Sequence, residues 1–350
     1  MAVHEGKARP ECPLTIQFEA ARQLILGSGK MASSNPALGA HLQPFSGIPT
    51  FMRRPATRDL DGVDLAVVGV PFDSGTSYRS GARFGPRKIR EASLLLWGHN
   101  PTLGVSPLER LTVVDYGDIE VVPVDIEATM RAIESEVGEL LSAGVRVLTL
   151  GGDHSIALPL LRAHAGKFGP LAVVQFDSHP DTWNREYPDH PYSHGTPFRR
   201  AIEEGLIDTQ AYVQVGIRGP VGDAGDLAEA QQLGAQIITI NRAMEMGIPS
   251  VIEYLRAAVG QRPAYVSLDI DAADPAFAPG TGTPEVGGFT SFQMLELVRG
   301  LRGLHLVGFD LVEVNPSYDH GDITAILAAN LAFEFLSLVA LAKAPPPDPR

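Results

Sequence analysis

The sequence contains a single cysteine, Cys12, among its 350 residues. One thiol forms no disulfide within the chain and cannot supply a zinc site built from several cysteines. Such a chain suits a reducing compartment, and we expect a cytoplasmic protein. Met1 to Thr15 also lack a basic patch followed by an apolar run, so no secretory signal is expected there.

Basic residues are scarce, with 28 Lys and Arg against 41 Asp and Glu and a formal net charge of -13. Because nucleic-acid binding depends on clustered Lys and Arg, we expect no nucleic-acid partner, and a small cationic molecule suits this charge better. One run, Ile323 to Ala340, approaches a membrane span in length. Glu334 lies well inside that run and would be costly in lipid, so we predict a buried helix and no membrane partner.

Beyond Phe51, short β-branched runs alternate with amphipathic stretches of helical length, and neither an internal repeat nor a linker interrupts the series. This alternation is typical of a parallel sheet that helices cover on both faces. We predict an α/β fold, a single domain of three layers with a mainly parallel sheet of about eight strands. The expected strands are 64–70, 111–115, 146–150, 171–176, 212–217, 236–240, 264–270 and 305–311. The expected helices are 86–96, 124–142, 155–167, 197–204, 251–259, 291–301 and a long helix from Asp322.

The sequence divides into three expected segments. Residues 1–44 form an N-terminal extension with one possible helix at 16–26 and a Gly/Ser/Pro-rich passage. Residues 45–343 form the folded domain, and residues 344–350 form a disordered tail.

Acidic and histidine side chains follow several of the expected strands. Asp177, His179 and Asp181 lie at alternate positions after strand 171–176, so in an extended chain they point to one side. Asp269 and Asp271 repeat this spacing at the end of strand 264–270, and His154 follows strand 146–150. Because ligand sites of parallel sheets lie outside the carboxyl ends of the strands, we expect these side chains to meet at one edge.

Together these residues offer two histidines and four aspartates, which are six oxygen or nitrogen ligands at three strand ends. A single ion cannot use all six well, whereas two ions bridged by shared carboxylates can. Such a pair lowers the pKa of a bridging water enough to supply hydroxide at neutral pH. The alternative for any one aspartate alone is a turn or helix cap.

The chain resembles the ureohydrolases, the family of arginase, agmatinase and their relatives, from about Phe45 to Ala340. The resemblance implies an arginase-like fold and a metal-dependent hydrolase that cleaves C–N bonds of linear amidines. It is specific, because the six ligand types occur in the right order across three separated motifs. The motifs that carry it are 69–73 (GVPFD), 81–86 (GARFGP), 151–154 (GGDH), 177–181 (DSHPD), 269–274 (DIDAAD) and 313–316 (EVNP).

Two divalent ions per chain, Mn or Ni, are implied by the resemblance. It makes His154 and Asp181 terminal ligands of one ion and His179 and Asp271 terminal ligands of the other, with Asp177 and Asp269 as bridges. The ligand set does not separate the two metals, since such sites bind several divalent ions.

Two further residues correspond to the family's catalytic groups. Glu313 matches the glutamate that binds the guanidinium, although a surface carboxylate in a turn is its alternative. His194 matches a mobile-loop histidine that transfers a proton to the leaving amine, whereas His190 is the competing candidate and either histidine could cap helix 197–204. Asp271 would also stabilise the tetrahedral intermediate.

The resemblance is weaker in the loops that would bind the tail of the substrate. Arginases carry an asparagine where this chain has Trp183, so arginine is disfavoured, and Trp183 offers an aromatic wall for the substrate or plain packing. Agmatine is the default substrate by family frequency, with guanidinobutyrate, free guanidine and a biguanide such as metformin as alternatives. Arg79 and Arg83 are expected to be structural, because they would repel a cation.

Two other functions compete with this one. A catalytically silent subunit of the same fold should have lost a metal ligand or Glu313, and none is lost. A zinc deacetylase of related architecture would use fewer aspartates around one ion. Family members are typically trimers or hexamers, so we expect a homo-oligomer, and assembly with a related second subunit stays open.

Overall fold

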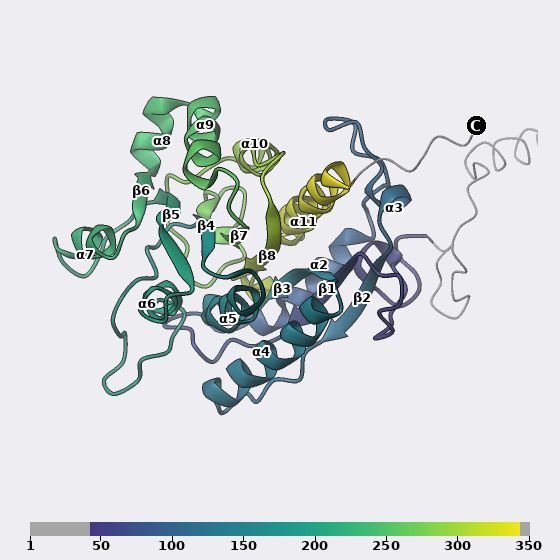
Figure 1. Cartoon of the computed structure of the whole chain (residues 1–350), viewed down its shortest axis with the longest axis horizontal. Coiled ribbons are helices and arrows are strands. Elements are labelled where there is room, and N and C mark those ends of the chain that lie inside the picture. The colour runs from purple at the N-terminus through teal and green to yellow at the C-terminus, as the bar shows by residue number, and fades with distance from the viewer. Residues whose placement is uncertain (1–42, 344–350) are drawn as a thin grey trace, which may run out of the picture.

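Eight strands form one sheet in the order β2-β1-β3-β8-β7-β4-β5-β6 in a computed structural model that describes residues 43–343 (Figure 1). All seven neighbouring pairs are parallel. The α/β fold and the eight-stranded sheet are therefore confirmed. The strands are β1 (Leu65–Val70), β2 (Val113–Asp118), β3 (Arg146–Gly151), β4 (Leu171–Phe176), β5 (Ile207–Ile217), β6 (Gln236–Thr239), β7 (Ala264–Asp269) and β8 (Leu306–Val312).

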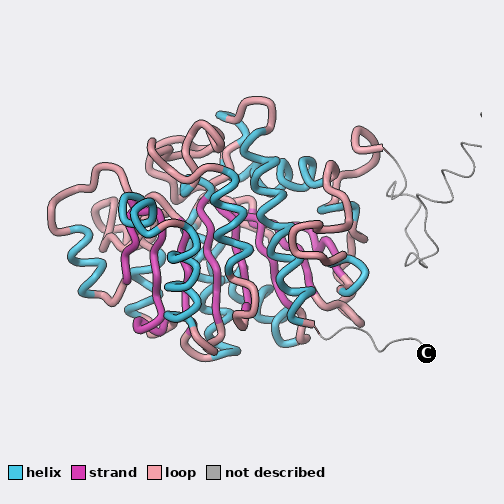
Figure 2. Tube along the Cα trace, turned by 90° about the horizontal axis from the view of Figure 1, so that it is seen from above, coloured by secondary structure: helices cyan, strands magenta, loops and turns pink. Residues whose placement is uncertain are grey.

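The central strands are apolar almost throughout because helices cover both faces of the sheet, as Figure 2 shows. In β1, Leu65 and Val67 belong to one hydrophobic core, while Ala66 and Val68 belong to the other. Successive strand side chains point to opposite faces, so one continuous apolar run supplies two cores.

The helices form the two outer layers. The first core is covered by α2 (Gly85–Ser93), α8 (Ile240–Met246), α9 (Ile248–Val259), α10 (Ser291–Gly300) and α11 (Ile323–Ala342), with the short α3 (Pro107–Arg110) against α11. The second core is covered by α4 (Ile126–Ser142), α5 (Ala157–Phe168), α6 (Pro197–Glu203) and α7 (Asp226–Gln232). The predicted three layers are thus present.

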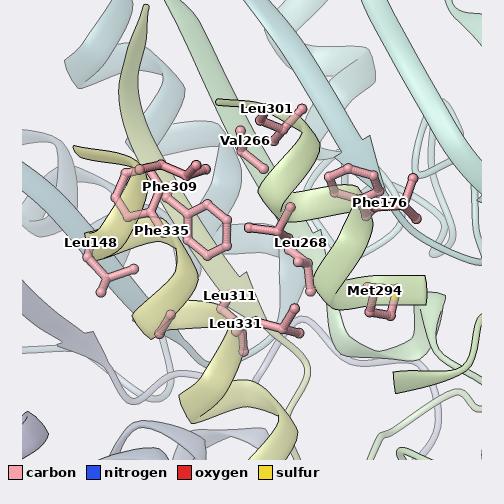
Figure 3. Packing of buried hydrophobic residues seen from close by; sticks show 14 of the residues in the cluster. Leu148, Phe176, Val266, Leu268, Met294, Leu301, Phe309, Leu311, Leu331 and Phe335 are labelled. Atoms are coloured by element: carbon pink, nitrogen blue, oxygen red, sulfur yellow. The ribbon is translucent and has the colours of Figure 1, made fainter. Parts of the chain in front are cut away.

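The apolar helix α11 is a core helix of this domain. By length and composition alone it could cross a membrane, but most of it is buried against α2, α10 and β8. Phe335 stacks on Phe309 of β8 with ring centroids 4.6 Å apart (Figure 3). Glu334 is buried, and the guanidinium of Arg299 donates to it at 2.6 Å, so the charge inside this helix is paired. The buried helix predicted from Asp322 is confirmed.

Some boundaries differ from the prediction. Helices α7 and α8 were not expected, and β6 ends at Thr239 because the Thr239 side chain accepts the backbone N–H of Arg242 and begins α8 there. Strand β5 begins five residues earlier than expected, at Ile207 instead of Tyr212. The possible helix at 16–26 and the expected tail at 344–350 lie outside the described residues.

His164 on α5 is a buried histidine away from the sheet edge. Its Nδ1–H donates to the carbonyl of Leu160 at 2.7 Å, its ring lies edge-on to Tyr265, and Nε2 has no partner in the described part of the chain. A Cβ at Gly308 would come within 2.4 Å of Nε2, so the glycine of β8 makes room for this ring. Burial lowers the pKa of His164 to about 4.

We predict that His164 makes the fold sensitive to acid. Since the pKa is lower in the folded protein than in the unfolded chain, the unfolded state binds the proton first. Stability should therefore fall as the pH drops from about 6.5 to about 4, with a contribution of about 3 kcal/mol from this residue. Urea unfolding of the wild type and His164→Leu across this range measures it. A stability difference between the two proteins that stays constant with pH contradicts the prediction.

Candidate metal centre

The candidate site lies at the carboxyl ends of β3, β8, β7 and β4, which are neighbours in the centre of the sheet. His154 begins the turn after β3, and Glu313 directly follows β8. Asp269 is the last residue of β7, and Asp177 directly follows β4. Parallel crossover connections therefore bring residues that are far apart in sequence to one edge, where parallel sheets place their ligands.

One group of potential ligands surrounds Nδ1 of His154. This atom lies 2.9 Å from Oδ2 of Asp181, 3.1 Å from Oδ2 of Asp177 and 3.4 Å from Oδ2 of Asp269. All four side chains are buried. Two ligand atoms at about 2.1 Å from one ion and at right angles are about 3 Å apart. These spacings therefore suit a single divalent ion.

A second group forms around Nδ1 of His179. This atom lies 3.0 Å from Oδ2 of Asp271 and 3.7 Å from Oδ1 of Asp177. Asp177 thus offers one oxygen to each group, as a bridging carboxylate requires. Asp269 approaches His154 through Oδ2, while its Oδ1 accepts the backbone N–H of Asp271 at 2.8 Å. The bridging role of Asp269 stays a prediction.

The backbone between these ligands is not extended, and this part of the sequence prediction is wrong. Strand β4 ends at Phe176, and Asp181 has a φ of 49°, which is uncommon outside glycine. Asp271 likewise lies in a 3-10 turn, Ile270–Ala272, and not on the strand. The ligands converge because side-chain hydrogen bonds shape two loops, and strand alternation accounts only for where the loops begin.

A hydrogen-bonded chain fixes the orientation of the His154 ring. The hydroxyl of Ser267 donates to Asp310 at 2.7 Å, so its oxygen accepts the Nε2–H of His154 at 2.8 Å. Tyr265 donates to the other oxygen of Asp310. In the neutral imidazole, Nδ1 therefore carries a lone pair that faces three carboxylates. Only a cation at that point, a proton or a metal ion, makes this arrangement favourable.

The charges of the cluster also require a cation. Burial raises the pKa of Asp181 to about 7, and burial together with the charge of Asp271 raises the pKa of Asp269 well above its usual value. Burial disfavours the imidazolium of His154, yet hydrogen bonds to the surrounding carboxylates outweigh it and raise that pKa. Oδ2 of Asp271 faces Nδ1 of His179 at 3.0 Å but accepts no well-aligned hydrogen bond from the described residues. The donor set fits a divalent metal centre.

Glu313 is placed beside the metal ligands with one oxygen free. Its Oε1 accepts the backbone N–H of His154 at 2.9 Å and faces Nδ1 of His194 at 2.9 Å. Its Oε2 is buried and has no partner in residues 43–343. Glu313 has a φ of 63°, so the backbone is held in an unfavourable conformation to aim this side chain. A free buried carboxylate oxygen is suited to bind a cationic group.

His194 joins Glu313 to the outside of the site. In the neutral ring, the backbone N–H of Ser77, which points at Nε2 from 3.1 Å, favours the tautomer with its proton on Nδ1, facing Glu313. Burial disfavours the charged ring, but the Glu313 carboxylate raises the pKa of His194 to about 10. His190 is exposed, and Thr196 occupies the N-cap of α6, so neither histidine caps that helix.

Trp183 is half-buried at the side of this loop. Its Nε1–H donates to Asp226 at 3.0 Å, and a Cβ at Gly195 would come within 2.7 Å of the indole. The ring is therefore fixed next to the segment that carries His194. Its contact with a substrate stays a prediction.

The arginines near the site have structural contacts. Arg83 pairs with Asp73, and the guanidinium of Arg79 lies over the ring of Tyr78 and over that of Tyr318. Arg218 donates to the backbone carbonyls of Asp271, Ala273 and Glu285, and so holds the turn that carries Asp271.

Several supporting residues were not foreseen from the sequence: Gln175, Tyr212, Gln214, Ser267 and Asp310. All of them lie inside buried strands and bond to the ligands or to one another. A polar side chain within an apolar strand could have indicated them, because a buried polar group needs a hydrogen-bond partner.

Comparisons with known proteins agree with this geometry. Residues 63–337 match the model of the arginase family. The chain is 47% identical over 305 residues to guanidinopropionase of Pseudomonas aeruginosa, covering 87% of this chain and 96% of that protein. It is 42% identical to mitochondrial agmatinase of Gallus gallus, covering 84% and 86%. The structure of proclavaminate amidino hydrolase from Streptomyces clavuligerus superimposes with a TM-score of 0.83 at 45% identity, covering 86% of this chain and 100% of that one. The chain belongs to the arginase family.

Proposed function

We propose that this protein is a two-metal amidinohydrolase that releases urea from a small guanidino compound. The observation that carries the proposal is a pair of histidine–aspartate groups that share Asp177, next to the free buried oxygen of Glu313. When bound, two divalent ions, Mn or Ni, supply hydroxide at neutral pH by lowering the pKa of water. The ligand residues would be His154, Asp177, His179, Asp181, Asp269 and Asp271.

Glu313 is the group that binds the guanidinium in this proposal. The four aspartates balance the charge of two divalent ions, whereas Glu313 lies outside both ligand groups. A guanidinium presents N–H pairs in one plane, and a carboxylate oxygen accepts them strongly. Binding at Oε2 would satisfy a buried acceptor that the described residues leave free.

His194 moves the proton that the leaving amine needs. Its Nδ1 faces Glu313, where the guanidinium is held, and Nε2 faces the hydroxyl of Ser77 at 2.7 Å. Ser77 is exposed, so the ring connects the buried carboxylate to the outside. An imidazole in this position can deliver a proton inward and recover it from solvent.

The candidate substrates differ in the group attached to the guanidinium, which we call the tail. The relatives are named for compounds with opposite tail charges: guanidinopropionate ends in a carboxylate and agmatine ends in an ammonium. Agmatine stays the default, with guanidinobutyrate, free guanidine and metformin as alternatives. We also propose a cytoplasmic homo-oligomer, a trimer or hexamer, on the single cysteine and on the family resemblance.

A silent assembly subunit receives less support. All six ligand residues and Glu313 are present, and they lie together at the sheet edge. A subunit without catalysis has no need for a buried, unpaired carboxylate oxygen in that position.

The first prediction of this proposal concerns turnover. Protein loaded with Mn²⁺ or Ni²⁺ should release urea, or a urea-like product, from at least one of agmatine, guanidinopropionate, guanidinobutyrate, guanidine and metformin. Colorimetric urea assays with each metal, supported by mass spectrometry of the amine product, measure it. The absence of turnover with every compound and both metals would overturn the proposal.

Glu313→Gln should lower kcat/KM by about 100-fold or more, because a buried charge pair loses one partner. Metal binding should be retained, since Glu313 lies outside both ligand groups. Steady-state kinetics with the best substrate, next to metal analysis of the same preparation, separate the two effects. Unchanged kinetics in the Gln variant would assign guanidinium binding to another group.

His194→Ala should lower kcat by about 100-fold, the usual size of a general acid–base contribution, and leave the metals bound. Added imidazole should restore part of the rate, because the missing side chain is a proton carrier. His190→Ala is the matched control and should retain wild-type turnover, since His190 is exposed. Full activity of His194→Ala would remove the proton-transfer assignment.

A further inference from the structure

Three buried side chains lie directly beneath the loop that carries Asp177, His179 and Asp181. We name Gln175, Tyr212 and Gln214 the glutamine platform. Gln175 of β4 and Gln214 of β5 are direct partners across the two strands, and Tyr212 precedes Gln214 by two residues on the same face. All three are fully buried, and among the described residues every polar side-chain atom they carry has a partner except Oε1 of Gln214.

The hydrogen bonds of the platform fix which way the Gln175 amide points. Its Oε1 accepts the hydroxyl of Tyr212 at 2.6 Å and an N–H of Gln214 at 2.9 Å. The amide nitrogen of Gln175 is therefore turned to the other side, where it donates to Oδ2 of Asp177 at 2.8 Å and to the carbonyl of His179 at 3.3 Å. Tyr212 and Gln214 thus orient the amide nitrogen of Gln175 toward Asp177, although neither of them contacts that carboxylate.

The platform also holds the backbone of the loop. The side-chain nitrogen of Gln214 donates to the carbonyl of Pro180 at 2.6 Å, immediately before Asp181 with its φ of 49°. Together the two glutamines contact the Asp177 carboxylate and two successive carbonyls. These contacts hold the loop from Asp177 to Asp181, which was expected to be an extended chain.

The donor on Asp177 determines what that carboxylate can still bind. Its Oδ1 accepts the backbone N–H of His179 at 2.7 Å, and its Oδ2 accepts Gln175. Each oxygen therefore uses one lone pair on the chain and keeps one. The two remaining lone pairs point to the two ligand groups, so the carboxylate can serve two ions at once.

We propose that Gln175 is a positioning residue of the metal centre and that Tyr212 acts on the centre through it. The inference rests on the proposed two-metal function and extends it to residues that lie outside both ligand groups. Gln175 contacts the Asp177 carboxylate directly, and Tyr212 contacts it only through Gln175. A neutral amide is required, because one side must donate to Asp177 and the other must accept from Tyr212 and Gln214. Glutamate would add a charge beside four aspartates, and methionine would remove the acceptor of the Tyr212 hydroxyl.

Calorimetric titration of metal-free protein with Mn²⁺, and in parallel with Ni²⁺, tests the inference. Gln175→Met should weaken metal binding by about 10- to 100-fold, the usual effect of losing an outer-shell hydrogen bond. Tyr212→Phe should weaken it by about 10-fold, and unchanged affinity in this variant would contradict its role. The double variant should bind no more weakly than Gln175→Met alone, because the tyrosine acts through the amide.

Thr129→Val is the matched control. Thr129 is a buried residue near the N-terminus of α4, and its hydroxyl donates to the backbone carbonyls of Val122 and Asp125. It should lose stability without losing metal affinity, which separates a local effect at the centre from general destabilisation. If Gln175→Met does not fold, Tyr212→Phe and Thr129→Val still decide the question through the same titration.

The outcomes are distinct. The positioning role is overturned if Gln175→Met binds metal with wild-type affinity. It is also overturned if the double variant loses as much affinity as the two single variants together. Either result leaves the proposed function intact. Binding of fewer than two ions by the wild type overturns the proposed function itself. The inference is supported if both platform variants bind metal more weakly, their losses of affinity do not add in the double variant, and the metal affinity of Thr129→Val is unchanged.

Discussion

The burial of four aspartates at the centre of one sheet edge is the constraint on which the rest of this structure depends. An oxygen of Asp177 lies within 4.8 Å of an oxygen of Asp181, and one lies within 4.8 Å of an oxygen of Asp271. Like charges at such a separation repel strongly in a medium that excludes water. The fold accepts this arrangement only with cations among them. The proposed hydrolysis of guanidino compounds follows from it, since bound metal ions would supply the nucleophile and Glu313 would receive the substrate's charge.

The protein supports this centre from below and from the side. Asp310 and Ser267 set the tautomer of His154, and the glutamine platform sets the Asp177 loop. Asp181 and Glu313 both adopt left-handed backbone conformations, which persist only when surrounding contacts hold them. The strands beneath are packed on both faces, so these supports rest on closely packed core strands.

The sequence allowed the sheet and the ligand types to be predicted because both leave strong local patterns. A parallel sheet covered on both faces demands continuous apolar strands such as 171–176, and ligands then follow each strand end. The path of the loop could not be predicted, because the φ of Asp181 depends on contacts with β5 that lie far away in sequence. Gln175 and Ser267 were missed for a related reason: one polar residue within an apolar run hardly changes the pattern of hydrophobicity. The substrate tail is set by loops around Trp183, where neither periodicity nor ligand spacing applies.

The most direct test of the two-metal account is the anomalous scattering of crystals grown with Mn²⁺. The account predicts two peaks per chain, one beside Nδ1 of His154 and one beside Nδ1 of His179, with the Asp177 carboxylate between them. A single peak, or none at this edge of the sheet, would contradict it.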